Sequence, residues 1–95
     1  MEKLTNFING KFVSPRSNQY LDVYEPATGQ VYAQLADSNS DDINNAVESA
    51  QNAFENWSGL SVKERADYLN KISDGLTARL DEFSEFESRD TGKPI

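Results

Sequence analysis

The chain has 95 residues, with nine basic and sixteen acidic residues, a formal net charge of −7, and neither cysteine nor histidine. Without cysteine it can form no disulfide, thiolate nucleophile or zinc–thiolate site, and without histidine it lacks the usual general base near neutral pH. The acidic balance argues against nucleic acid and anionic membranes as partners, because both carry negative charge. No apolar run approaches the roughly 20 residues of a membrane helix, and the N-terminus lacks the apolar core of a signal peptide. We therefore expect a cytoplasmic protein.

A first β-hairpin is predicted over residues 6–13. Asn9-Gly10 lies between two apolar pairs, and a two-residue type I′ turn needs positive φ at both central positions, which this dipeptide tolerates. A two-stranded ribbon of this size is marginally stable alone, so we expect it to pack on another element.

A second hairpin is predicted over residues 20–36. Runs rich in β-branched and aromatic residues flank a five-residue connection, Glu25 to Gly29. Pro26 fixes its own φ and biases the preceding residue away from helix, while Gly29 supplies the position that most needs positive φ. The pattern is that of a strand, a tight turn and a strand.

The first helix is predicted over residues 40–57. Ser38 or Ser40 can cap its first amides, and Asp41 and Asp42 place negative charge at the positive end of the helix dipole. That role explains the acidic pair better than a catalytic acid–base couple does. The apolar residues recur at three- and four-residue steps and form one stripe: Ile43, Ala46, Val47, Ala50, Ala53, Phe54 and Trp57.

Two further helices are predicted, over residues 61–80 and 81–91. Ser61 and Glu64 have the spacing of a capping box, and Asp81 is the expected cap of the third helix. The second helix carries its own apolar stripe, formed by Val62, Ala66, Leu69, Ile72, Leu76 and Leu80. Aromatic residues at helical spacing are usually core, so we expect the pairs Phe54–Trp57 and Phe83–Phe86 to be buried.

These elements predict an α+β fold, in which antiparallel β-ribbons (residues 1–36) precede three helices packed as hairpins (residues 37–95). The apolar stripes exceed what two small ribbons can cover. We therefore expect the isolated chain to expose a large apolar surface, to associate, and to unfold with poor cooperativity.

Several motifs occur in one order along the chain: NFINGKF, YEPATGQVYAQ, a helix ending in WS, ER, and finally ESRDTGKP. In this series the chain resembles the N-terminal segment of an NAD(P)-dependent aldehyde dehydrogenase, from Asn6 to Pro94. Within that superfamily it is most similar to the 2-hydroxymuconic and 2-aminomuconic semialdehyde dehydrogenases. The resemblance implies that the complete protein has the α/β aldehyde dehydrogenase fold, of which residues 1–95 are an incomplete domain.

The resemblance also implies the chemistry of the parent enzyme, which oxidises a small aldehyde to a carboxylic acid with NAD or NADP. The family's catalytic cysteine, general-base glutamate, oxyanion-stabilising asparagine and nucleotide-binding glycines would all lie downstream. The fragment thus has no catalytic or cofactor-binding residues of its own, and its partners are the remainder of its chain and other subunits of a dimer or tetramer. The alternative is a stand-alone, non-catalytic interaction module with the same N-terminal fold.

One family feature can be placed on this sequence by position. Many members hold a monovalent cation, K⁺ or Na⁺, through backbone carbonyls just before the residue–proline pair and through the aspartate of the DTGK motif. Those positions are Val23, Tyr24 and Asp90. Carbonyl and carboxylate oxygens suit such an ion. The alternative is that Asp90 caps or pairs locally where its helix ends.

Overall fold

The computed structural model describes every residue from Met1 to Ile95. Five strands come first: β1 (Glu2–Leu4), β2 (Asn6–Ile8), β3 (Lys11–Val13), β4 (Tyr20–Glu25) and β5 (Gln30–Ala36). Three helices follow: α1 (Ser40–Ser58), α2 (Val62–Ala78) and α3 (Leu80–Thr91). The α+β prediction is confirmed, and none of the three helices has the length and hydropathy needed to cross a bilayer.

Both predicted hairpins form. In the first, β2 and β3 are antiparallel, and the turn has φ values of 54° at Asn9 and 74° at Gly10, as a type I′ turn requires. In the second, β4 and β5 are antiparallel, and Gly29 at the end of the connection has φ 69°. The register shifts between Val23 and Tyr24, which pair with Ala33 and Val31, so Tyr32 is the extra residue of a bulge in β5.

β1 was not predicted; it pairs in parallel with β5, with Glu2 opposite Ala33 and Leu4 opposite Leu35. The larger sheet consequently has three strands in the order β1-β5-β4, while β2 and β3 form a sheet of their own. A three-residue strand is too short to show the alternating pattern by which strands are recognised. Its pairing gives β5 a neighbour on both sides.

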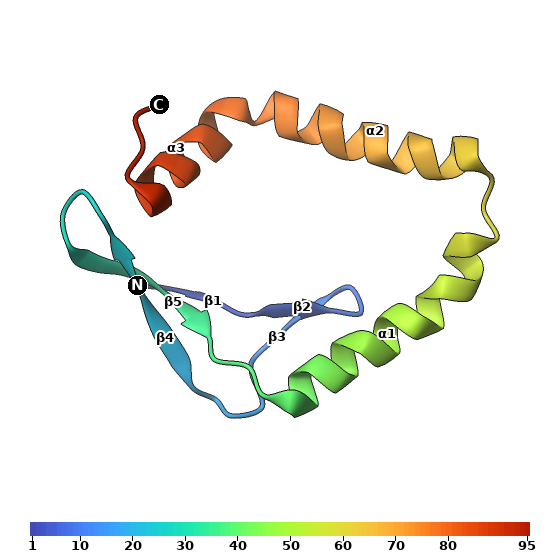
Figure 1. Cartoon of the computed structure of the whole chain (residues 1–95), viewed down its shortest axis with the longest axis horizontal. Helices are drawn as coiled ribbons and strands as arrows, with labels where there is room; N and C mark the ends of the chain where they lie inside the picture. Colours follow the sequence, from blue (N-terminus) through green and yellow to red (C-terminus); the bar gives the residue numbers. More distant parts are fainter.

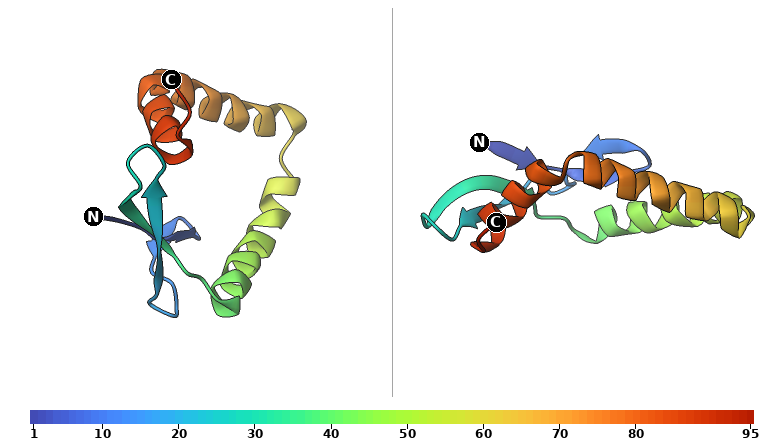
Figure 2. Two further views of the ribbon diagram at one scale, coloured as in Figure 1. Left: turned by 60° about the vertical axis from the view of Figure 1, so that its left-hand side comes forward. Right: turned by 90° about the horizontal axis from the view of Figure 1, so that it is seen from above.

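The elements follow one another around an open ring (Figure 1). α1 leads away from the sheets, α2 returns across the opposite side, and α3 ends beside the β4–β5 hairpin. The molecule measures 48 × 35 × 16 Å and is flat when seen from above (Figure 2). The expectation that the helices pack as hairpins is therefore wrong: α1 and α2 diverge from their connection instead of lying face to face.

The first helix is capped differently from the prediction. Its N-cap is Asn39, whose side chain accepts hydrogen bonds from the amides of Asp41 and Asp42. Asp42 completes a capping box through the Asn39 amide and also accepts from the Arg16 amide at 3.0 Å. Ser38 bonds instead to Asn6 at the start of β2. Asp42 is only 4% exposed, and its carboxylate joins the start of α1 to the loop between β3 and β4 that contains Arg16. Its role is therefore structural.

The second and third helices meet at a single residue. As predicted, the Ser61 side chain accepts from the Glu64 amide, at 3.1 Å, but the Glu64 carboxylate makes no return bond. The third helix begins one residue earlier than expected, so Asp81 lies inside its first turn and is not the cap. The N-cap position is Arg79, which makes no capping bond and instead pairs with Glu82 at 2.7 Å. One non-helical residue between two helices leaves no room for a separate cap.

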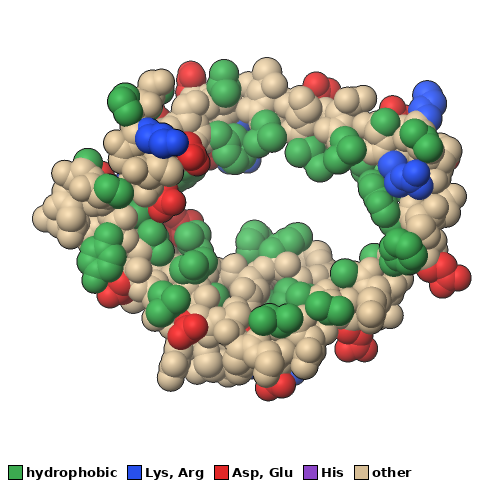
Figure 3. Space-filling model, in the orientation of Figure 1, with side chains coloured by type: hydrophobic (Ala, Val, Ile, Leu, Met, Phe, Trp, Pro, Cys, Tyr) green, Lys and Arg blue, Asp and Glu red, His purple; other side chains and the backbone are tan.

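Almost no core is present. Only Pro15, Ala33 and Asp42 are buried. The aromatic pairs expected in the core are not buried: Phe54 is 66% exposed, and Phe86 is 54% exposed. Hydrophobic side chains gather around the opening of the ring (Figure 3). We call the exposed apolar residues of the helices the helical apolar face: Ile43, Val47, Phe54, Trp57, Val62, Tyr68, Leu69, Ile72, Leu76, Leu80, Phe83 and Phe86.

The large exposed apolar surface predicted from the stripes is thereby confirmed. The stripes have the right period, but the chain contains no second layer against which they can pack. Association and the sharpness of unfolding remain predictions.

Candidate functional site

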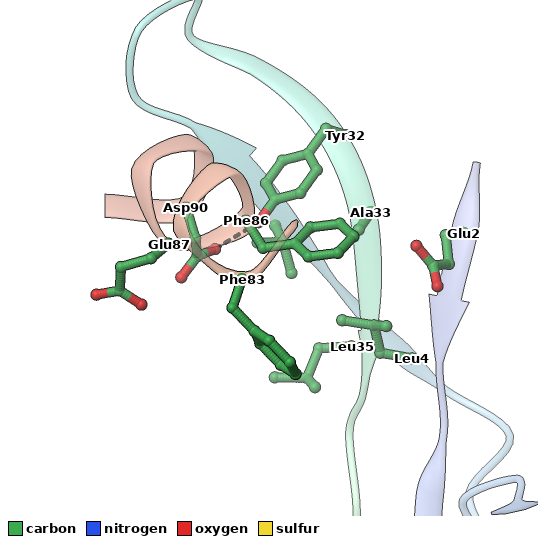
Figure 4. A pocket seen from close by; sticks show the side chains of 10 residues that line it. Glu2, Leu4, Tyr32, Ala33, Leu35, Phe83, Phe86, Glu87 and Asp90 are labelled. Atoms are coloured by element: carbon green, nitrogen blue, oxygen red, sulfur yellow. Dashed lines mark hydrogen bonds between the residues drawn. The ribbon is translucent and has the colours of Figure 1, made fainter. Parts of the chain in front are cut away.

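The largest pocket lies where α3 meets the three-stranded sheet and has a volume of 630 Å³ (Figure 4). Its wall is mainly apolar. The lining residues come from β1 (Glu2 and Leu4), from β4 and β5 (Val23, Tyr32, Ala33 and Leu35), and from α3 (Phe83, Phe86, Glu87 and Asp90).

Local structure explains how the pocket is built. Phe83, Phe86 and Asp90 are three and four residues apart, so a helix places them on one face. Across the sheet, Leu4 lies opposite Leu35 in the parallel register of β1 and β5. Two aromatic rings of α3 therefore lie over an aliphatic floor, and a carboxylate lies one turn further along the helix.

A hydrogen bond joins the two sides of the pocket. The Tyr32 hydroxyl of β5 donates to Asp90 Oδ1 of α3 at 2.6 Å, as the dashed line in Figure 4 shows. This bond is the main cause that raises the pKa of Tyr32 above 10.0, and desolvation and the negative charge of Asp90 act in the same direction. The phenol therefore keeps its proton over the neutral range and holds Asp90 in place.

Three further contacts fix α3 on the β4–β5 hairpin. Arg89 Nε lies 3.1 Å from Glu25 Oε2, and the Arg89 guanidinium lies 4.6 Å from the centre of the Tyr32 ring. Gly92, the left-handed residue that ends α3, is so close to the turn that an added Cβ would lie 3.1 Å from Pro26 Cβ. We call this set the α3 clasp: Glu25, Pro26, Tyr32, Arg89, Asp90 and Gly92.

The structure brings together part of the cation site expected from the resemblance. Val23 and Asp90 both line the pocket, and Tyr24 follows Val23 in β4, opposite the bulge in β5. Oδ1 of Asp90 accepts the Tyr32 hydrogen bond from β5, which is a long-range contact and not the local cap or pair given as the alternative, and Oδ2 remains free.

The donor chemistry restricts the kind of ion. No group of three or more carboxylate, histidine or cysteine side chains is arranged to hold a metal ion. A single carboxylate with neutral carbonyl oxygens suits a weakly charged ion better than a multivalent one. The residues present thus fit a monovalent cation and do not fit a zinc or calcium centre.

No sequence pattern predicted Glu25, Tyr32 and Arg89 as partners in this region. Glu25 and Arg89 are 64 residues apart, and Tyr32 and Asp90 are 58 residues apart. No local spacing connects residues so distant. The only signal was indirect. The YEPATGQVYAQ turn and the ESRDTGKP helix end, two of the motifs that carry the family resemblance, are the segments that contact each other in the α3 clasp.

The sequence profile described as "Aldehyde dehydrogenase family" matches residues 12–95. This chain belongs to the aldehyde dehydrogenase family. It is 45% identical over 92 residues to the human 2-aminomuconic semialdehyde dehydrogenase, covering 97% of this chain and 18% of that protein. It is 42% identical to the 2-hydroxymuconic semialdehyde dehydrogenase of Pseudomonas sp. (strain CF600), covering 99% of this chain and 20% of that protein.

Solved structures agree with this assignment. The crystal structure of PnpE in complex with nicotinamide adenine dinucleotide matches with a TM-score of 0.93 and 32% identity, over 96% of this chain and 19% of that one. This aldehyde dehydrogenase chain therefore spans about a fifth of the length of the curated relatives it matches. The open ring is a shape that a much longer solved protein also contains.

Proposed function

We propose that this chain is the N-terminal segment of an enzyme that oxidises an aldehyde, of the muconic semialdehyde class, to a carboxylic acid with NAD or NADP. One observation supports this most strongly: the chain is 45% identical to a 2-aminomuconic semialdehyde dehydrogenase over nearly its whole length but spans only 18% of that protein. The NAD-bound state of the similar structure PnpE supports the choice of nucleotide.

In this proposal the reacting groups lie outside these 95 residues. A cysteine thiolate of the complete enzyme attacks the aldehyde, a hydride passes to the nicotinamide, and water releases the acid. The residues described here supply scaffold. The helical apolar face packs on the rest of the same polypeptide, and the complete protein is a cytoplasmic dimer or tetramer. The large exposed apolar surface supports such an internal interface.

The pocket beside the clasp takes a structural role in the same proposal. Backbone carbonyls of Val23 and Tyr24, together with the free oxygen of Asp90, hold K⁺ or Na⁺. The bulge in β5 supports this role, because it lies opposite Val23 and Tyr24 and disrupts the ladder there. When bound, the ion contributes positive charge between the hairpin and the end of α3.

The experiment compares two purified proteins, the 95-residue chain and the product of the same reading frame continued beyond Ile95. Each is mixed with 2-hydroxymuconic semialdehyde and NAD, and NADH formation is followed by absorbance. We expect turnover by the longer protein and none by the 95-residue chain. Turnover by the short chain, or a reading frame that stops after Ile95, would contradict the proposal and favour the stand-alone module.

A further inference from the structure

The β2–β3 turn carries an asparagine with an unusual combination of features. Asn9 and Gly10 are both exposed, both have positive φ, and a Cβ added to Gly10 would meet nothing within 4 Å. The Asn9 side chain makes no hydrogen bond to the rest of the chain. No other asparagine in the sequence is followed by glycine. The backbone nitrogen after Asn9 is therefore the least hindered of its kind in the molecule.

We propose that Asn9 is a site of spontaneous covalent modification, namely deamidation through a cyclic imide. The Gly10 backbone nitrogen attacks Cγ of Asn9, a new C–N bond forms, and the side-chain nitrogen leaves as ammonia with the proton from the Gly10 amide. Water then opens the imide at either carbonyl. One product is aspartate and the other is isoaspartate, and no oxidation or reduction takes place.

The fold gives this turn little protection. Ring closure requires the Asn9 backbone to rotate out of the turn conformation, so the hairpin must open first. The β2–β3 sheet has only two strands of three residues each, and isolated two-stranded hairpins are marginally stable in water. Its aromatic pair, Phe7 and Phe12, is itself 64% and 79% exposed. Local opening is therefore frequent compared with opening of a packed element.

The product changes the hairpin chemically. Both outcomes add a negative charge to an already acidic chain, and isoaspartate inserts a methylene group into the main chain. A two-residue turn fixes the register of its strands, so the isoaspartate form cannot keep the present pairing of Phe7 with Phe12. The ring centroids of these residues now lie 5.0 Å apart.

The test is peptide mapping by mass spectrometry after incubation of the folded chain in mildly alkaline buffer. We expect Asn9 to show the largest converted fraction, as aspartate and isoaspartate peptides that chromatography separates. Asn18 is the internal control, because it is also exposed and has φ 55° but is followed by Gln19. Conversion of Asn18 at the same rate as Asn9 would overturn the proposal.

Two variants sharpen the test. Gln19→Gly gives Asn18 the same following residue, and we expect conversion at Asn18 to rise to the range of Asn9. Asn9→Asp removes the reacting amide while keeping a residue that tolerates positive φ. The mass change that accompanies loss of the amide should therefore no longer occur at residue 9. An Asn9 amide that persists while Asn18 of the Gln19→Gly variant reacts would show that the hairpin blocks ring closure, and would contradict the proposal.

Discussion

The two sides of the ring differ in how they are held. Where α3 meets the β4–β5 hairpin, specific contacts join residues about 60 positions apart, including Arg89 with Glu25 and Tyr32 with Asp90. Along α1 and α2, by contrast, large apolar residues such as Phe54 and Leu69 are more than half exposed. The clasp thus finds its partners within the chain, whereas the helical apolar face finds almost none. The α3 clasp therefore holds the chain together, whereas the helical apolar face is a surface suited to packing within a larger protein.

The largest effect is expected from Gly92→Ala, with Gly29→Ala as the matched control. Both glycines have positive φ, at 78° and 69°, so both substitutions incur the left-handed cost of about 1–2 kcal/mol. Only at Gly92 does the new Cβ also meet Pro26, at 3.1 Å. Amide hydrogen exchange should therefore show a greater loss of α3 protection for Gly92→Ala. Equal losses in the two variants would mean that the close approach does not hold α3.

A smaller effect of opposite sign is expected from Gly75→Ala in α2. A Cβ at this position meets nothing within 4 Å, and glycine inside a helix is about 0.5–1 kcal/mol less favourable than alanine. Hydrogen exchange should show slower exchange in α2 and unchanged exchange in α3. A decrease in α2 protection would indicate that Gly75 is in close contact with something that the ring does not contain.

The smallest effect concerns Tyr32 and depends on pH. Its pKa is raised above 10.0 mainly by the hydrogen bond to Asp90, so folding favours the neutral phenol. The stabilisation is fully present below the unfolded pKa and is lost as pH rises through the higher folded value. Wild-type α3 should lose amide protection in this alkaline range, after correction for intrinsic exchange, while Tyr32→Phe shows weaker protection and no such step.

Tyr24→Phe serves as the control for that titration. The Tyr24 hydroxyl makes no hydrogen bond, and its side chain is 57% exposed. This variant should therefore keep the alkaline step of the wild type. A step that persists in Tyr32→Phe but vanishes in Tyr24→Phe would assign the titration to Tyr24. It would contradict the role given to the Tyr32–Asp90 hydrogen bond in the clasp.

Local chemistry made much of the fold predictable. Asn9-Gly10 and Gly29 fixed both turns because few residues tolerate positive φ, and the apolar period located all three helices to within a few residues. The N-cap of α1 was assigned to Ser38 or Ser40, yet Asn39 takes it. Three adjacent residues can all cap, and the choice depends on Asp42 and Arg16, which tertiary structure brings together.

The site was less predictable than the fold. Asp90 was identified through the family motif, but its partner Tyr32 lies on another element, and a single sequence carries no signal for such a pair. The burial of Phe83 and Phe86 was predicted from their spacing, which reports that a face is apolar and not what covers it. The two residues whose burial was wrongly predicted belong to the helical apolar face, which this chain leaves exposed.

Sedimentation of the purified 95-residue chain over a range of concentrations, combined with its thermal unfolding, tests most directly whether the helical apolar face lacks a partner within the chain. We predict association that increases with concentration and a broad unfolding transition. A monomer at every concentration, with a sharp transition independent of concentration, would contradict the account.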